Sequence, residues 1–238
     1  MPPSRTASGA HAGQPALTTG QPLGRAQVVV IMLHGRGAGP ENILELVPAL
    51  ARPDATYLAP AAANHTWYPY SFMSDLARNE PFLSSALSVL GSLVSEIETA
   101  GISRDHIVVM GFSQGACLAT EFAIRNASRF GGFAAFSGGA IGPPGTTWAA
   151  EGTTTRATES TEGTDQSSGG FYGTPIFFGC SDVDPHIPEA RVRESAEVCT
   201  RMGADVTTRI YPGMGHLVND DEIAWAQELL RSLSQARS

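Results

Sequence analysis

The sequence predicts an α/β fold in which a mostly parallel central sheet has helices on both faces. Two patterns lead to this prediction. Short β-rich runs alternate with stretches of helical periodicity, and several helical stretches end at a glycine suited to a helix C-cap, such as Gly101 and Gly203. The length of 238 residues fits one domain with a sizeable core. We therefore expect a single domain over residues 26–238, with right-handed crossovers between parallel strands.

The expected elements follow one another along the chain in that alternating order. Residues 16–19 are a candidate for a short additional edge strand. The main strands are expected at residues 28–33, 56–59, 107–110, 132–137, 175–178 and 206–211. The helices between them are expected at residues 41–51, 81–100, 116–129, 189–202 and 222–233.

Two segments do not follow this alternation of strands and helices. Residues 1–25 are rich in Ser, Gly, Pro, Thr and Ala, and we expect most of them to form a disordered N-terminal tail. Residues 141–172 are rich in Gly, Thr, Ser and Glu and show neither strand nor helix periodicity, which indicates a flexible polar insertion. This insertion is either a simple disordered loop or a lid, but it contains no apolar helix, and we expect no large cap domain.

The composition excludes several classes of protein. The net charge is −8, and all 15 basic residues are arginine, so nucleic acid is an unfavourable partner. Either a GC-rich genome or a salty cytoplasm explains the lack of lysine. No apolar stretch is long enough to span a bilayer, and residues 1–24 lack the apolar block of a secretory signal, so we expect a cytoplasmic protein without stable membrane insertion. The three cysteines have no metal-ligand or redox spacing, which favours reduced thiols and no metal site.

The most informative motif is Gly-Phe-Ser-Gln-Gly at residues 111–115, between the apolar run 107–110 and the helical stretch 116–129. A strand that turns at once into a helix forces Ser113 into a strained backbone conformation, and Gly111 and Gly115 remove side chains that would clash there. The five letters alone are a weak signal, but the strand before them and the helix after them make the pattern specific. It predicts a nucleophile elbow with Ser113 as nucleophile.

A serine nucleophile needs a base and an acid that orients the base. His216 follows the last strand in a glycine-containing loop and is the best candidate for the base. Asp184 and Asp182 both follow the strand at residues 175–178. We favour Asp184 as the orienting acid because Pro185 fixes a tight loop beside it, whereas Asp182 is suited to capping that turn. The other histidines have simpler expected roles: His11 in the tail, His106 before the elbow strand, and His34, His65 and His186 in loops.

The glycine-rich loop at residues 33–39 follows the first main strand and can supply one backbone N–H donor to an oxyanion. The amide of Gln114 can supply the other. The same loop lacks the Lys-Ser/Thr ending of a P-loop and the G-x-G-x-x-G spacing of a dinucleotide site. No cofactor is therefore expected.

Four segments together resemble the phospholipase/carboxylesterase group of α/β-hydrolases, which includes the acyl-protein thioesterases. The resemblance covers roughly residues 27–233 and rests on segments 33–37, 111–116, 182–188 and 213–216. It implies an α/β-hydrolase fold, in which the chain order Ser, Asp, His is the expected one. By this likeness Ser113 is the nucleophile, Asp184 and His216 are its partners, and the amides of Arg36 and Gln114 form the oxyanion hole. Many members of the group carry a Gly-Asp pair in the first loop, where this chain has Arg36-Gly37-Ala38.

Apolar residues near the expected site are candidate substrate-binding residues: Trp67, Tyr68, Phe72 and Ile187. Such residues equally suit a core or a subunit contact, so a homodimer is left open. The leading interpretation is a serine carboxylesterase that hydrolyses short- to medium-chain esters of small molecules. The alternatives are an acyl-thioesterase or lysophospholipase with the same triad, and a non-catalytic α/β-hydrolase that binds a ligand.

Overall fold

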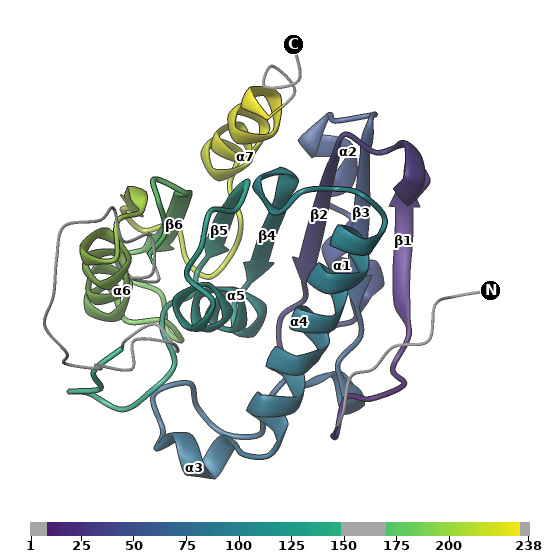
Figure 1. Ribbon diagram of the computed structural model, residues 1–238. Helices are drawn as coiled ribbons and strands as arrows, with labels where there is room; N and C mark the ends of the chain where they lie inside the picture. The colour runs from purple at the N-terminus through teal and green to yellow at the C-terminus, as the bar shows by residue number, and fades with distance from the viewer. Residues whose placement is uncertain (1–8, 149–169, 234–238) are drawn as a thin grey trace, which may run out of the picture.

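A seven-stranded sheet runs through the centre of the molecule (Figure 1). The computed structural model describes residues 9–148 and 170–233. The strand order is β1-β3-β2-β4-β5-β6-β7, and every neighbouring pair is parallel except β1 with β3. The strands are β1 (Ala16–Gly20), β2 (Val28–Leu33), β3 (Ala55–Pro60), β4 (Ile107–Phe112), β5 (Gly132–Phe136), β6 (Pro175–Ser181) and β7 (Asp205–Tyr211).

Helices cover both faces of the sheet, as the sequence predicted. The α-helices are α1 (Pro40–Leu44), α2 (Val47–Leu50), α3 (Leu76–Asn79), α4 (Phe82–Thr99), α5 (Gln114–Arg125), α6 (Glu189–Arg201) and α7 (Asp220–Ser232). The single helix expected at residues 41–51 is instead two short helices. Pro48 has no backbone N–H, so it cannot continue the helical hydrogen bonding that begins in α1.

The interior strands are buried on both sides, so their side chains alternate between two apolar cores. In β2, Val29 packs in the core that includes Leu90 of α4, whereas Val30 packs in the core that includes Leu230 of α7. Helices α4, α5 and α6 cover the first face, and α1, α2 and α7 cover the second. This double burial explains why the strands read as continuous apolar runs.

The register of the parallel strands places their carboxyl ends at one edge of the sheet. Leu33 of β2 pairs with Gly111 of β4, Phe112 of β4 pairs with Phe136, and Ser181 of β6 pairs with Tyr211. The loops that follow β2, β4, β6 and β7 therefore gather at the same edge, where ligands bind in open α/β sheets.

The N-terminal segment is more ordered than the sequence suggested. β1 pairs antiparallel with β3 over its whole length, and the His11 side chain is buried. Its ring Nε2 lies 2.9 Å from the carbonyl oxygen of Trp67, and its Nδ1 accepts a 3.0 Å hydrogen bond from the amide of Ala63. The edge strand expected at residues 16–19 is therefore confirmed as β1, whereas the disorder expected for the rest of the tail does not hold for residues 9–15 and 20–25, because tertiary partners offset the entropy of ordering them.

The polar insertion predicted at residues 141–172 lies partly outside the described residues, which stop at 148 and resume at 170. Both of its described ends are packed into the protein. Ile141 and Phe171 are fully buried, and the ring of Phe171 meets the ring of Phe133 edge-on. The predicted flexibility therefore does not hold at either end of this segment.

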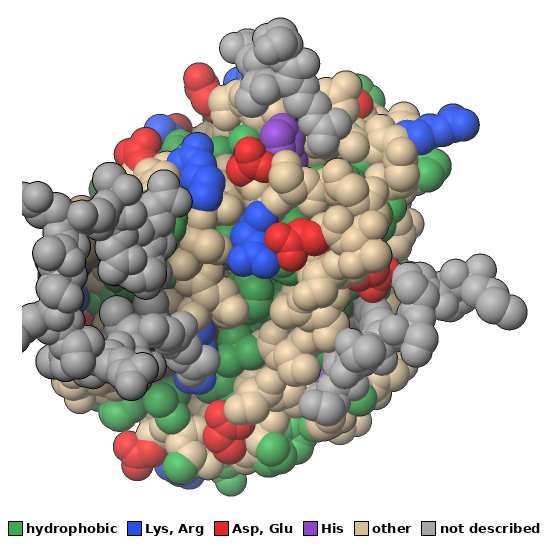
Figure 2. Space-filling view, viewed as in Figure 1, with side chains coloured by type: hydrophobic (Ala, Val, Ile, Leu, Met, Phe, Trp, Pro, Cys, Tyr) green, Lys and Arg blue, Asp and Glu red, His purple; other side chains and the backbone are tan. Residues whose placement is uncertain are grey.

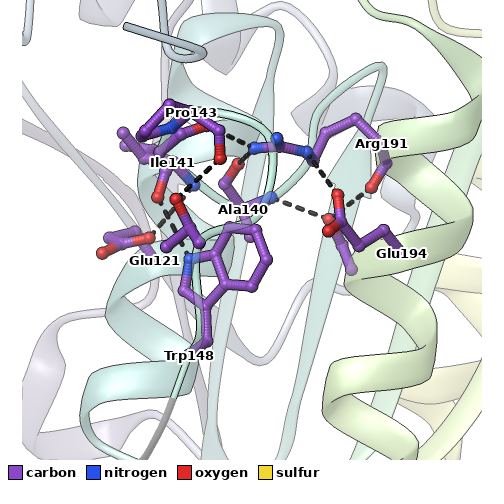
Figure 3. Close-up of polar contacts among 10 residues, drawn as sticks. Glu121, Ala140, Ile141, Pro143, Trp148, Arg191 and Glu194 are labelled. Atoms are coloured by element: carbon purple, nitrogen blue, oxygen red, sulfur yellow. Dashed lines mark hydrogen bonds and ion pairs between the residues drawn. The ribbon is translucent and has the colours of Figure 1, made fainter. Parts of the chain in front are cut away.

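A buried arginine anchors the first of these ends (Figure 3). Arg191 of α6 donates hydrogen bonds from Nη1 to the carbonyl oxygens of Ala140 and Gly142, at 2.9 and 2.7 Å, and its guanidinium lies over the ring of Trp148. The indole N–H of Trp148 in turn donates to the carbonyl of Ile141. These contacts fix the chain after β5 against α6.

Charged side chains of both signs are spread over the face of the molecule that Figure 2 displays. Acidic and basic side chains lie beside each other there, and the described residues form no continuous basic patch on that face.

Candidate active site

Ser113 occupies a sharp turn between β4 and α5. Its backbone has φ 56° and ψ −119°, in a region that L-residues rarely adopt. A Cβ atom on Gly111 would lie 2.5 Å from backbone atoms of Gly115, and a Cβ on Gly115 would lie 2.2 Å from the carbonyl oxygen of Leu33. The two glycines are therefore required by close backbone contacts, as the elbow interpretation predicted.

Asp184 and His216 form a short hydrogen bond at the same edge of the sheet. Asp184 Oδ2 lies 2.6 Å from His216 Nδ1, and Asp184 Oδ1 accepts hydrogen bonds from the amides of His186 and Ile187 at 2.8 and 3.0 Å. Burial alone would raise the pKa of Asp184, but the bonds from His216 and the two amides outweigh it and lower the pKa. The carboxylate therefore stays ionised and holds the Nδ1–H tautomer of His216.

Polar contacts hold the loop that carries His216. Asp182 Oδ1 accepts a 2.8 Å hydrogen bond from the amide of Gly213, and Ser181 Oγ accepts one from the amide of Gly215 at 3.1 Å. Asp182 thus caps the loop of His216 rather than the turn of its own segment, which the sequence had suggested. The imidazole of His216 also packs against two rings, those of Phe112 and His186, with ring centroids 4.8 and 4.9 Å away.

Two backbone amides near Ser113 are candidates for an oxyanion hole. The N–H groups of Arg36 and Gln114 have no acceptor among the described residues, whereas the neighbouring amides of Gly37 and Ala38 are already used by His65 and Gly35. Gln114 is the first residue of α5, so the positive end of the helix dipole adds to its amide.

A cavity of about 420 Å³ opens at the elbow. Ser113 and His216 both line it, and so do three of the four predicted substrate-binding residues, Tyr68, Phe72 and Ile187. The remaining lining residues are Gly35, Arg36, Ala38, Asn42, Ser71, Phe112, Gln114, Cys117 and His186.

Trp67, the fourth candidate, does not line the cavity. Its side chain is fully buried, and its indole N–H donates to the carbonyl oxygen of His34 at 2.9 Å. The side chain of Gln114 accepts from the amide of Trp67 and donates to the carbonyl oxygen of Tyr68. The assignment of Trp67 to substrate binding is therefore wrong; its role is to tie the segment after β3 to the elbow.

Glu222 in α7 is a buried carboxyl group that the sequence analysis did not single out. It forms a capping box with Asn219, three residues after His216, while its Oε1 has no hydrogen-bond partner in the described structure. Burial raises its pKa to about 7. The Asn-x-x-Glu spacing is a sequence pattern typical of a helix start, but the sequence does not show that the Glu222 side chain is buried.

The three cysteines are unpaired and buried, and burial raises the pKa of Cys117 to about 11. Within residues 9–148 and 170–233, no group of three or more His, Cys, Asp or Glu side chains is arranged to hold a metal ion. No helix in those same ranges is long and apolar enough to cross a membrane.

Comparison with known proteins identifies the family. A family model described as phospholipase/carboxylesterase matches residues 16–234. The chain belongs to the phospholipase/carboxylesterase family. The resemblance noted from its four motifs and the α/β-hydrolase fold are thereby confirmed. Among solved structures, a phospholipase/carboxylesterase from Dyadobacter fermentans is 38% identical, with a TM-score of 0.80, and the alignment covers 95% of this chain and 100% of that one.

Other curated proteins and solved structures resemble the chain at lower sequence identity. Acyl-protein thioesterase 1 from Gibberella zeae is 28% identical over 161 residues, which are 67% of this chain and 62% of that protein. The chain thus spans about six-tenths of the length of the curated relatives it matches first. The carboxylesterase of Bacillus cereus shares the fold, with a TM-score of 0.67, 18% identity and coverage of 93% of this chain and 95% of that one.

Proposed function

We propose that the protein is a serine carboxylesterase that hydrolyses short- to medium-chain carboxylic esters through an acyl-enzyme. One observation carries this proposal. The strained elbow residue Ser113 and the base His216 line the same cavity, and His216 is bound to the ionised carboxylate of Asp184 at 2.6 Å. A nucleophile, a base and an orienting acid are the three groups that acyl transfer through serine requires.

In this mechanism His216 takes the proton of Ser113 as the serine oxygen attacks the ester carbonyl. The same proton then passes to the departing alcohol, which leaves Ser113 acylated. Water, deprotonated by His216, cleaves the acyl-enzyme and regenerates the serine. Asp184 remains ionised and stabilises the imidazolium that forms in each half-reaction, in keeping with the direction of its pKa shift.

The negative charge on the carbonyl oxygen needs hydrogen-bond donors that are already in place. We assign this role to the amides of Arg36 and Gln114, which lack acceptors elsewhere in the described residues. Removing one donor of this kind costs about 100-fold or more in turnover. The proposal requires no cofactor.

Two features of the cavity support small-molecule esters as substrates. The cavity volume of about 420 Å³ falls in the range of small-ligand sites, and Tyr68, Phe72 and Ile187 give it apolar walls.

The buried, unpaired cysteines fit a reducing compartment, so we propose a cytoplasmic enzyme.

Thioester hydrolysis is the second candidate. Acyl-protein thioesterase 1 is the name of several curated relatives, at 27 to 28% identity. The same triad and donors would serve, because a thioester differs from an ester at the leaving group.

The test is a panel of p-nitrophenyl esters from acetate to palmitate, with acyl-thiocholine esters of matching length, assayed on wild type and Ser113→Ala. We expect turnover to peak at short or medium esters and to fall by about six orders of magnitude in the variant. A peak at long chains or a preference for thioesters would favour the thioesterase alternative. No turnover of any substrate by folded protein would favour a non-catalytic binding protein.

A further inference from the structure

The cavity carries a charge opposite to that of the chain as a whole. The protein has a net charge of −8, yet none of the described residues lining the cavity is Asp or Glu, and Arg36 is the only Lys or Arg among them. The N-terminus of α5, at Ser113, adds a partial positive charge. A binding site that is lined by a positive charge and by no acidic side chain favours an anionic ligand.

The guanidinium of Arg36 is held in place by neutral groups. Nη1 donates to Thr66 Oγ1 at 3.1 Å and to the carbonyl oxygen of Pro69 at 3.0 Å, and Nη2 donates to the carbonyl oxygen of Tyr70 at 2.8 Å. Within the described parts of the chain, no carboxylate lies within ion-pair distance of it. Its charge is therefore fixed in position without being compensated.

The donors left over suit a carboxylate. A guanidinium has five N–H groups, and the contacts to the segment 66–70 use three of them. The Nε–H and one Nη2 hydrogen remain. Two such donors on neighbouring nitrogens match the two oxygens of a carboxylate, which is the geometry that arginine recognises best.

The loop that carries Arg36 lies beside the candidate nucleophile. A Cβ atom on the preceding residue, Gly35, would lie 3.5 Å from Cβ of Ser113, so this loop contacts the elbow directly. Both Arg36 and Ser113 line the cavity. A molecule whose ester carbonyl is at Ser113 can thus present a second group to the guanidinium.

From these contacts we propose that the Arg36 side chain binds a carboxylate of the substrate. The substrate class is then an ester that carries a second, anionic group, either a half-ester of a dicarboxylic acid or an ester whose alcohol part bears the carboxylate. This inference rests on the proposed esterase function. The competing explanation is that the side chain only tethers residues 66–70, and the two explanations predict different kinetics.

The test compares anionic and neutral esters of matched shape. For the acyl side, the pair is mono-p-nitrophenyl adipate and its methyl ester. For the alcohol side, the pair is p-acetoxybenzoate and its methyl ester. We expect wild type to show a kcat/KM at least tenfold higher for the anionic member of one pair, and the pair that responds identifies the side that carries the carboxylate.

Variants separate recognition from tethering. Arg36→Gln should lower the ratio of kcat/KM for the anionic ester to kcat/KM for the neutral ester about tenfold or more. Arg36→Lys keeps the positive charge but loses the paired N–H donors of the guanidinium, and it should lower this ratio less. Arg78→Gln is the matched control, because Arg78 is also exposed and lies over the ring of Tyr70 in the same region. It should leave the ratio unchanged. Equal losses for both members of each pair in Arg36→Gln, or a wild-type ratio near one for both pairs, would overturn the proposal.

A binding measurement keeps this inference separate from the esterase proposal. Calorimetric titration of Ser113→Ala with monomethyl adipate should give heat of binding that dimethyl adipate does not, and adding Arg36→Gln should abolish it. If wild type hydrolyses neutral esters but this difference is absent, the anion site is wrong and the esterase proposal stands. If no ester is hydrolysed, the titration alone decides whether the anion site exists.

Discussion

The elbow and the loop that carries His216 lie at the same edge of the sheet, but different forces hold them. At the elbow, backbone atoms approach so closely that Gly111 and Gly115 have no room for a Cβ atom. In the loop of His216, a Cβ added at Gly213 or Gly215 would meet no atom within 4 Å. Hydrogen bonds that the loop donates to the side chains of Ser181, Asp182 and Asp184 hold it instead.

The difference separates two ways of positioning a reactive group. Steric exclusion fixes Ser113 whatever the pH, because no titratable group is involved. Hydrogen bonds to carboxylates fix His216, so its position depends on ionisation and on which acid accepts each bond. Substitutions of the same chemical kind should therefore have unequal effects in the two regions.

Apart from loss of the nucleophile itself, the largest effect is expected from Asp184→Asn. An amide at this position favours the wrong tautomer of His216 and cannot stabilise the imidazolium, so kcat/KM for p-nitrophenyl butyrate should fall by about three to four orders of magnitude. The matched control is Asp182→Asn, whose side chain accepts one exposed bond from Gly213, and the loss there should stay below about tenfold. Comparable losses in the two variants would refute the assignment of the acid to Asp184.

A smaller but still severe effect is expected when the elbow is crowded. Gly115→Ala would place a Cβ 2.2 Å from the carbonyl oxygen of Leu33 and should lower the free energy of unfolding by about 4 kcal/mol or more. Gly91→Ala makes the same change inside α4, where nothing lies within 4 Å, and should raise it by about 0.5 to 1 kcal/mol. Urea unfolding measures both, and a Gly115→Ala variant within 1 kcal/mol of wild type would contradict the steric account.

The third effect is confined to one range of pH. The pKa of Glu222 is raised from 4.5 to about 7 by burial, so the folded state keeps a proton that the unfolded state has lost. This contribution to stability is fully present below about pH 4.5 and disappears as the pH rises through 7. It amounts to about 3 kcal/mol, from about 1.4 kcal/mol for each pKa unit.

Glu222→Gln tests this contribution, because glutamine can keep the capping box with Asn219 while carrying no charge. The variant should be more stable than wild type at pH 8 and lose the decline in stability between pH 5 and 8. Glu228→Gln, at an exposed position of the same helix, should keep that decline. If thermal unfolding of wild type and Glu222→Gln changes with pH in parallel, Glu222 is not the group responsible.

The features that were predictable from the sequence are those encoded locally. The elbow needs only a β-rich run, two glycines around a serine and a helical stretch, all within about 25 residues. The helix start at Asn219 is likewise a short-range pattern, and the preference for Asp184 over Asp182 rested on the adjacent Pro185. Interior strands such as β2 and β4 were located because double burial makes each of them an apolar run.

Other features depended on contacts between residues far apart in the chain. The burial of His11 requires the segment after β3, and the position of Trp67 behind the cavity requires His34 and Gln114. An aromatic residue has the same local pattern in a core as in a pocket wall, and a polar segment reads as disordered until its partners are known.

The sequence by itself therefore determined the order of elements, the strained turn at Ser113 and the identities of the residues that follow the strands, because backbone propensity and periodicity act over short distances. The tertiary structure alone decided which side chains face the cavity, that Arg36 keeps an uncompensated charge there, and that Glu222 is buried. Those properties depend on desolvation and on hydrogen-bond partners, and both are set by how distant segments pack.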